Sequence, residues 1–386
     1  MANRSDPPGD GIAAALDRMI DSGSRAAADV ERARWYAERV FQRLLALETP
    51  QRRLVVANVP APMLSAVGYR LRDEARSRRH TDPRETLRLA ELAVVAAERI
   101  EEVGQRGTVL AEALTERGNA RRLLGDLAGG ERDFAEATRL LEEDGGDPLA
   151  EAELLSLRAS LARSRRDFLE AIELADEACS VYAFYGQVSG TLATLIQLGT
   201  FHGYAGDHEK GIDLLGRALE LAVDLGGSED LLHVANNIAL LFAEAGLPAD
   251  AAVVVERARE LADEVGNAHD RLRLDWLSAR IQSDLGHYSS AAIILGHLRA
   301  DYTEEGMPFE AALVSLELAL SYARLGRRYE QRELARETAE AFQLLGVERE
   351  AYGALALLAC ADAEEAVELS ARLAAAVRRT RSRGEI

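Results

Sequence analysis

The sequence predicts an all-α protein, an α-solenoid of stacked helical hairpins. Apolar residues recur at three- and four-residue spacing along most of the 386 residues, which is the period of amphipathic helices. Aromatic residues make up only 5% of the chain, and Ala, Leu, Glu and Arg dominate, as in helical proteins. Turn residues also recur at steps of 40 or 41 positions, at Gly125, Arg166, Gly206, Gly246, Gly286 and Gly326.

Residues 230–266 show the repeated unit most clearly. One apolar stripe over residues 231–242 predicts a helix, and a second stripe over 251–262 predicts another. The Gly-Leu-Pro sequence at 246–248 breaks the helix between them. A second ladder of glycines, at the same step, marks the loops between hairpins: Gly104, Gly145, Gly186, Gly226, Gly266, Gly306 and Gly346. Two interleaved ladders in one register predict that the hairpin recurs along the chain.

Small residues occupy fixed positions in both helices of the predicted hairpin. Seven residues before each turn stand Gly118, Ala159, Gly199, Ala239, Ala279 and Ala319. Five residues after it stand Gly130, Ala171, Gly211, Ala251 and Ala291, and only Gln331 breaks the series. Because small side chains allow two helix axes to approach closely, this pattern predicts tight packing within each hairpin.

Taken in order, the chain divides into four predicted sections. Residues 1–9, which contain Pro, Asp and Gly, are expected to be disordered. Residues 10–80 are expected to form an N-terminal helical section, with helices over 10–22, 25–47 and 63–78. Asp82 followed by Pro83 predicts the capped start of the repeat array, residues 81–346. Residues 347–386 are expected to form capping helices and a basic tail.

Several segments resemble the tetratricopeptide repeat, among them RGNARRLLGDLAGGERDFAEATRLL and LGTFHGYAGDHEKGIDLLGRALEL. The usual repeat has about 34 residues, so the chain resembles the extended bacterial type with repeats of about 40. The resemblance implies a right-handed superhelix in which the first helix of each hairpin lines a concave groove. The section before the repeats is also similar to that of bacterial repeat proteins with a zinc-binding or helix-turn-helix head. Here that section has no Cys/His cluster.

The composition excludes several classes of function. A net charge of −19 and a pI of about 4.9 argue against nucleic acid as the main ligand. No apolar run is long enough to span a membrane, and the opening residues lack the features of a signal peptide. Cys179 and Cys360 are too far apart in the sequence to indicate a disulfide framework or a zinc motif. A cytoplasmic protein is therefore expected.

No pattern of catalytic residues stands out. The glycines occur singly, without a phosphate-binding motif, and neither cysteine has an evident His partner. His202 and His208 flank one turn, but they lack the spacing of a metal site and are interpreted as surface residues. The sequence therefore predicts no catalytic residue, no metal site and no cofactor, and a protein that is not an enzyme.

The resemblance places a set of side chains in the groove, where they would contact a partner polypeptide. The predicted partner-binding residues are Asn119, Arg122, Arg163, Tyr204, His233, Asn236, Arg273, Trp276, Arg280 and Arg324. The arginines make this set more positive than the acidic chain around it, so a protein or peptide partner with acidic residues is expected. Trp276 has two interpretations: an exposed anchor between Arg273 and Arg280, or a side chain packed against the neighbouring hairpin.

The favoured function is a non-catalytic scaffold that binds a polypeptide segment in its groove. The alternative is a regulatory subunit or inhibitor in a bacterial transcription system of the sigma-factor type, or in a protease or defence system. A third, less favoured interpretation is that the protein is an enzyme. Repeats of this kind serve many unrelated partners, so the fold leaves the partner and the oligomeric state open.

Overall fold

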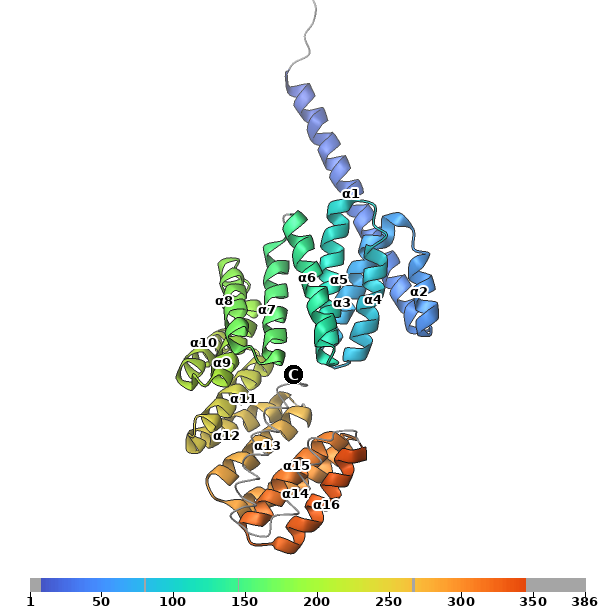
Figure 1. The fold of residues 1–386 in the computed structure, drawn as a ribbon. Helices are drawn as coiled ribbons and strands as arrows, with labels where there is room; N and C mark the ends of the chain where they lie inside the picture. Colours follow the sequence, from blue (N-terminus) through green and yellow to red (C-terminus); the bar gives the residue numbers. More distant parts are fainter. Residues whose placement is uncertain (1–7, 80, 145, 266–267, 345–386) are drawn as a thin grey trace, which may run out of the picture. The chain divides into compact units, whose positions relative to one another are not determined.

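Every regular element that the structure describes is a helix, and none is a strand (Figure 1). The computed structural model describes residues 8–79, 81–144, 146–265 and 268–344. This confirms the predicted all-α fold of stacked helical hairpins. The chain forms two compact units, residues 1–157 and 158–385. The predicted sections 1–9 and 347–386 lie wholly or mostly outside the described residues, and the predicted boundary at 80/81 stays a prediction.

Unit 1 contains the N-terminal helices and the first hairpin. Its elements are α1 (Pro8–Leu45), α2 (Thr49–Ala57), a short 3-10 helix (Ala61–Met63), α3 (Leu64–Arg78), α4 (Pro83–Ala97), α5 (Val103–Leu123), α6 (Leu127–Asp144) and the first part of α7 (Pro148–Arg165). The Asp82 carboxylate caps α4 by accepting a hydrogen bond from the Glu85 amide (3.0 Å). The predicted break between helices 10–22 and 25–47 is wrong, because α1 runs through Gly23. A single glycine costs a helix only about 1 kcal/mol.

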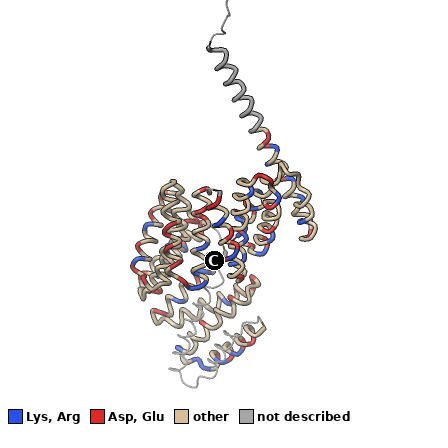
Figure 2. Tube along the Cα trace, turned by 45° about the horizontal axis from the view of Figure 1, so that its top comes forward, with Lys and Arg blue, Asp and Glu red and all other residues tan. Residues whose placement is uncertain are grey.

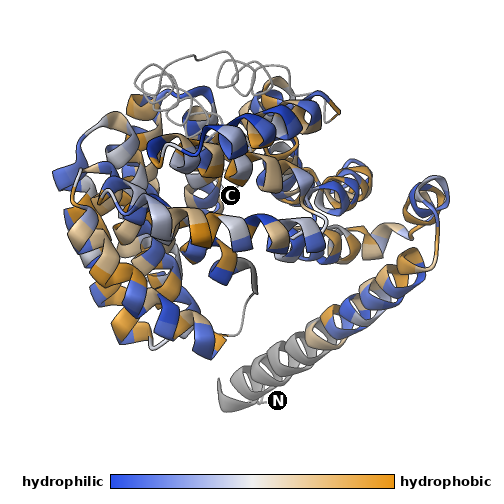
Figure 3. Ribbon diagram, turned by 90° about the horizontal axis from the view of Figure 1, so that it is seen from below, coloured by the Kyte–Doolittle hydropathy of each residue, from blue (hydrophilic) through white to orange (hydrophobic). Residues whose placement is uncertain are grey.

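Unit 2 continues with hairpins that follow one another along the chain. Its elements after α7 are α8 (Phe168–Phe184), α9 (Val188–Ala205), α10 (His208–Leu225), α11 (Ser228–Glu244), α12 (Pro248–Val265), α13 (Ala268–Asp284), α14 (Tyr288–Glu304), α15 (Pro308–Arg324) and α16 (Arg328–Leu344). Each helix packs on the next, and buried Leu and Ala side chains fill the space between them. The helices carry hydrophobic and hydrophilic residues on different sides (Figure 3).

The turn ladder ends the first helix of each hairpin. Gly206 has φ 93° and terminates α9, and the amide of Asp207 closes the turn on the carbonyl of His202 (2.9 Å). Gly246 has φ 76° in the next hairpin. Arg166 takes the same left-handed conformation, with φ 68°, although it has a side chain. Backbone geometry therefore explains why this position is glycine in the other repeats.

The small-residue ladders bring the paired helices into contact, as predicted. A Cβ atom built on Gly199 would lie 2.6 Å from the Leu215 side chain and 3.0 Å from the carbonyl oxygen of Gly211. In the following hairpin Ala239 and Ala251 are fully buried. The backbones therefore pass so closely at these points that only small side chains fit.

The described residues contain no single helix that is long and apolar enough to cross a membrane. Only a joined pair, Thr49–Ala57 with Ala61–Arg78, meets the length and composition criterion, and its two parts meet at a 113° bend.

Candidate functional site

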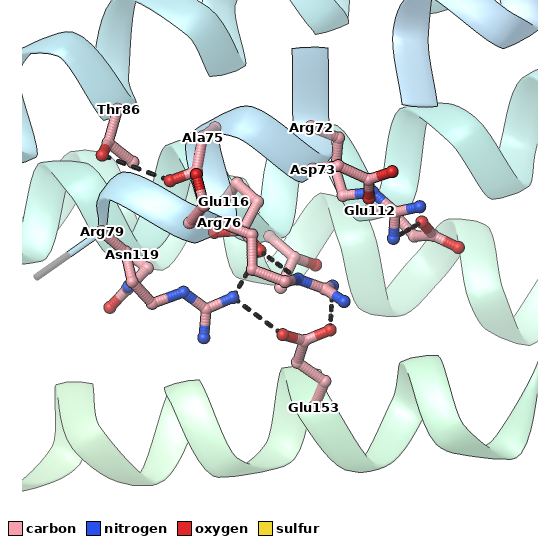
Figure 4. A network of polar contacts seen from close by, with 12 residues as sticks. Arg72, Asp73, Ala75, Arg76, Arg79, Thr86, Glu112, Glu116, Asn119 and Glu153 are labelled. Atoms are coloured by element: carbon pink, nitrogen blue, oxygen red, sulfur yellow. Dashed lines mark hydrogen bonds and ion pairs between the residues drawn. The ribbon is translucent and has the colours of Figure 1, made fainter. Parts of the chain in front are cut away.

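In unit 1, the inner side of α3 is occupied by the protein's own carboxylates (Figure 4). Arg72 and Arg76 lie on α3, and Arg79 caps its C-terminal end. They stand four and three residues apart, so they share one face. Arg79 contacts Glu116 of α5 (2.6 Å) and Glu153 of α7 (2.8 Å). The other pairs of this network are Arg76 with Glu116, Arg76 with Glu153, and Arg72 with Glu112. Arg72 also pairs with Asp73 (2.9 Å), so the three arginines face four carboxylates.

The burial of this network makes its pairing essential. Glu116 is 0% exposed. Burial raises the pKa of the Glu116 carboxyl, while Arg79 and Arg76 lower it and Glu153 raises it further. Removing one arginine would leave buried Glu116 with one partner instead of two, which costs more than losing an exposed ion pair. The sequence reading missed this network, although the arginine spacing and the i, i+4 pair of glutamates on α5 signal two facing charged stripes.

Asn119 and Arg122 lie on α5 beside this network and bind each other. Arg122 donates hydrogen bonds from Nε and Nη2 to the Asn119 side-chain oxygen, at 3.1 and 2.9 Å. Asn119 is 0% exposed and Arg122 is also buried. The Asn119 amide nitrogen has no hydrogen-bond acceptor among the described residues. Neither side chain is presented to a partner in this structure, and their predicted binding role stays a prediction.

In unit 2, three of the predicted residues line one pocket of about 320 Å³. His233 and Asn236 come from α11, and Arg273 comes from α13. Glu229, Asp230 and Asp270 complete the polar lining, so the pocket carries charges of both signs. The environment of the pocket lowers the pKa of His233, first by desolvation and then by the positive charge of Arg273. The imidazole is therefore held toward its neutral form, although Asp270 and Asp230 act in the opposite direction.

Arg163, Tyr204 and Arg280 form a second cluster in unit 2, which we call the arginine cluster. They come from α7, α9 and α13. The Tyr204 hydroxyl lies within hydrogen-bonding reach of Arg163 and within the electrostatic range of Arg280. Burial raises the pKa of Tyr204, and the two arginines act against that rise, while Glu244 of α11 adds to it.

The arginine cluster has more positive than negative charge. Arg163 is only 7% exposed, yet neither it nor Arg280 forms an ion pair within 4.0 Å with a described residue. The Nε atoms of both guanidinium groups are buried, and no acceptor for them occurs in the part of the chain that the structure describes. Unsatisfied buried donors of this kind have a strong tendency to bind an anionic acceptor. Basic and acidic residues elsewhere in both units are interspersed along the helices (Figure 2).

Trp276 is not the exposed anchor that one of the two interpretations assumed. Its side chain is 2% exposed and packs edge-to-face on Tyr302 of the next helix, with ring centroids 5.9 Å apart. The indole nitrogen donates a hydrogen bond to Glu317 (2.9 Å). The expectation of exposure is therefore wrong, because α14 of the same hairpin and α15 of the next hairpin cover the ring. The repeat register gave a mixed signal: the equivalent positions Ile196 and Leu316 are apolar and buried, whereas Ser156 and Asn236 are polar and half-buried.

Arg324 also stands apart from the two groups of unit 2. It is exposed at the end of α15, and its guanidinium lies 5.6 Å from the centroid of the Tyr288 ring. The structure thus brings together His233, Asn236 and Arg273 in one pocket and Arg163, Tyr204 and Arg280 in one cluster. Among the described residues, no group of three or more His, Cys, Asp or Glu is placed to hold a metal ion.

Comparison with known proteins identifies the repeat. Residues 190–264, which run from the first turn of α9 to the end of α12, match the tetratricopeptide repeat family. This segment of the chain is therefore built of tetratricopeptide repeats. No curated protein sequence matches the chain.

Solved structures resemble the whole chain in fold, at low sequence identity. The apo form of RapI has a TM-score of 0.59 at 12% identity, over 91% of this chain and 98% of that one. Aspartyl phosphate phosphatase F from Bacillus subtilis has a TM-score of 0.57 at 12% identity, over 78% and 75%. NprR in complex with its cognate peptide NprX has a TM-score of 0.53 at 14% identity, over 78% and 86%. These likenesses show the shared helical-repeat fold.

Proposed function

We propose that unit 2 binds a polypeptide segment with acidic residues, and that the protein acts as a non-catalytic interaction scaffold. The observation that carries this proposal is the arginine cluster, where Arg163 and Arg280 have buried donors without acceptors. A carboxylate can accept two parallel hydrogen bonds from one guanidinium, which makes arginine the preferred partner for such a group. The Tyr204 hydroxyl offers a further hydrogen bond at the same place.

The pocket and the arginine cluster are far enough apart to contact two different residues of one peptide ligand. Arg273 of the pocket and Arg280 of the cluster are seven residues apart on α13, which is about 10 Å along a helix at about 1.5 Å per residue. An extended peptide covers that distance with about three residues at about 3.3 Å each. The favoured ligand therefore has an acidic side chain at the cluster and a second polar or acidic side chain about three residues away.

The fold supports the same proposal. A solved structure with this fold, NprR, contains a bound cognate peptide. A preformed helical surface loses little conformational entropy on binding, so a few charged anchors are enough for a specific complex. The alternative of a regulatory subunit or inhibitor would use the same surface, and it stays a prediction from the sequence, as does the cytoplasmic location.

The test is selection of ligands from a random peptide library on the full chain, followed by fluorescence anisotropy with a labelled consensus peptide. We expect the selected sequences to be enriched in Asp and Glu. Arg163→Gln and Arg280→Gln should each weaken binding by roughly 10- to 100-fold, which corresponds to about 1.5–3 kcal/mol for a hydrogen bond to a charged group.

The matched control is Arg257→Gln, because Arg257 is exposed on α12 and, among the described residues, pairs only with Glu260 of the same helix. It should leave binding unchanged. A consensus without acidic residues, or equal affinities of all three variants and the parent, would refute the proposed role of the arginine cluster.

A further inference from the structure

A second surface lies in unit 1, far along the sequence from the arginine cluster. The side chains of α1 and α2 enclose an open groove of about 1140 Å³ near the C-terminal end of α1. Trp35, Arg39 and Arg43 stand at four-residue steps, so they form one row along α1. Leu54 and Val55 of α2 line the other side. The first part of α1 extends beyond the other helices of unit 1 (Figure 1).

Large apolar side chains are exposed in this groove. Trp35 is 60% exposed and Leu54 is 65% exposed. By contrast, Phe41 and Leu44, which do not line the groove, are buried against the rest of unit 1. An exposed Trp that shares a concave surface with a second large apolar residue is typical of an interaction site.

The positive charges that line the groove are not neutralised by described residues. Arg39 stacks on the Trp35 ring, with the guanidinium carbon 5.0 Å from the centroid, and forms no ion pair. Arg43 has none either in the described part of the chain. The one carboxylate in the lining, Glu38, is bound to Arg70 (2.7 Å), whose guanidinium also covers the Phe41 ring. The free charge at the groove is thus positive.

We infer that this groove binds an acidic amphipathic helix of a protein partner, with an apolar side chain against Trp35 and carboxylates at Arg39 and Arg43. The groove is larger than most pockets for small molecules, and its two walls are helices, so a third helix fits between them by packing of side-chain ridges. The carboxylates would pair with the arginine forks at the edge of the apolar contact. Trp35 would then be the central residue of the interface.

Trp35 also provides the measurement. The chain has two tryptophans, and the other, Trp276, is 2% exposed. Quenching of fluorescence by the neutral quencher acrylamide therefore reports mainly on Trp35. The probes are two synthetic amphipathic helical peptides with identical Leu positions, one with Glu and one with Lys at the polar positions. We expect the Glu peptide to protect Trp35 from acrylamide and the Lys peptide to leave it exposed.

The variants test the charge. Arg39→Glu combined with Arg43→Glu should weaken binding of the Glu peptide by roughly tenfold or more and allow binding of the Lys peptide. The control is Arg53→Glu, since Arg53 is exposed on α2 and does not line the groove. It should bind the Glu peptide as the parent does. Far-UV circular dichroism of each variant shows that the helices are intact.

Other occupants would give different results. Protection of Trp35 by phosphatidylglycerol vesicles but not by the Glu peptide would assign the groove to an anionic membrane surface and overturn the proposal. Protection that rises with the concentration of the protein alone, with a doubled mass by light scattering, would assign it to a second copy and also overturn it. Arg163→Gln and Arg280→Gln should not change the protection of Trp35. The experiment therefore tests this groove independently of the proposed function of unit 2.

Discussion

The close approach of α9 and α10 predicts that the same substitution has opposite effects at two positions of one helix. Gly211 and Gly216 both lie in α10. A Cβ atom on Gly211 would lie 2.6 Å from the carbonyl oxygen of Gly199 and 2.5 Å from the Leu241 side chain. A Cβ atom on Gly216 would meet nothing within 4 Å. Gly211→Ala should therefore destabilise the protein, and Gly216→Ala should stabilise it.

The magnitudes follow from the contacts. Leu241 can move by changing its rotamer, but the Gly199 carbonyl belongs to the backbone of α9, so α9 and α10 must separate. Overpacking of this kind costs about 1–3 kcal/mol. Gly216→Ala removes the entropic cost of a helical glycine and gains roughly 0.5–1 kcal/mol. The two variants should thus differ by about 1.5–4 kcal/mol, the sum of these estimates.

The assay combines urea unfolding, followed by circular dichroism, with amide hydrogen exchange in α9 and α10. Exchange gives the local stability, which matters because repeat arrays need not unfold in a single step. Gly211→Ala should accelerate exchange in both helices, and Gly216→Ala should slow it. If Gly211→Ala were as stable as Gly216→Ala, the close backbone contact at this point would not exist. Other hairpins carry Ala171, Ala251 and Ala291 at the position of Gly211, so the ladder alone would not predict this cost.

Four further predictions concern single residues. Arg166→Gly should stabilise unit 2 by about 1 kcal/mol, because a non-glycine residue at φ 68° is strained; no rise in the urea midpoint would contradict this. Trp276→Ala should cost about 3–5 kcal/mol and Trp35→Ala less than about 0.5, because only Trp276 is buried; equal thermal melts would refute the assignment. Arg79→Ala should destabilise unit 1 by about 1–3 kcal/mol, since buried Glu116 keeps Arg76 but loses one of its two arginine partners, and Glu116→Gln in the same background should recover part of the loss. The pKa of His233 is lowered in the folded protein, so the folded state favours the neutral imidazole. The contribution of His233 to folding stability is therefore fully present above pH about 6.5, its unfolded pKa, and is lost as the pH falls through the folded pKa. His233→Gln should flatten the dependence of the urea midpoint on pH in that window.

The sequence predicted the parts of the fold that depend on local backbone chemistry. The turn ladder was confirmed because a left-handed residue is needed at the end of each first helix, and glycine has the least strain there. The helix start at Asp82 was predicted from a cap that involves only neighbouring residues. The break at Gly23 was wrong because one glycine does not overcome the preference of the surrounding residues for a helix.

The candidate site was less predictable, because it depends on which side chains meet across helices. The repeat register placed Arg163, Tyr204 and Arg280 on first helices, but only the structure shows that they converge while Arg324 lies elsewhere. The pairing of Arg79 with Glu116 and Glu153 joins residues 37 and 74 positions apart, and no local pattern specifies such partners. The exposure of Trp276 could not be decided from its arginine neighbours, which flank a buried or an exposed ring equally well.

Photo-crosslinking of the selected peptide tests the central claim most directly. A photoreactive phenylalanine would replace either Leu240, which lies on α11 between the pocket residues and Glu244, or Val253, which is exposed on α12. The proposed function predicts that the photoreactive residue at position 240 forms a covalent crosslink to the labelled acidic peptide. Arg163→Gln combined with Arg280→Gln should abolish this crosslink. A crosslink at position 253 and none at position 240 would contradict the proposed function.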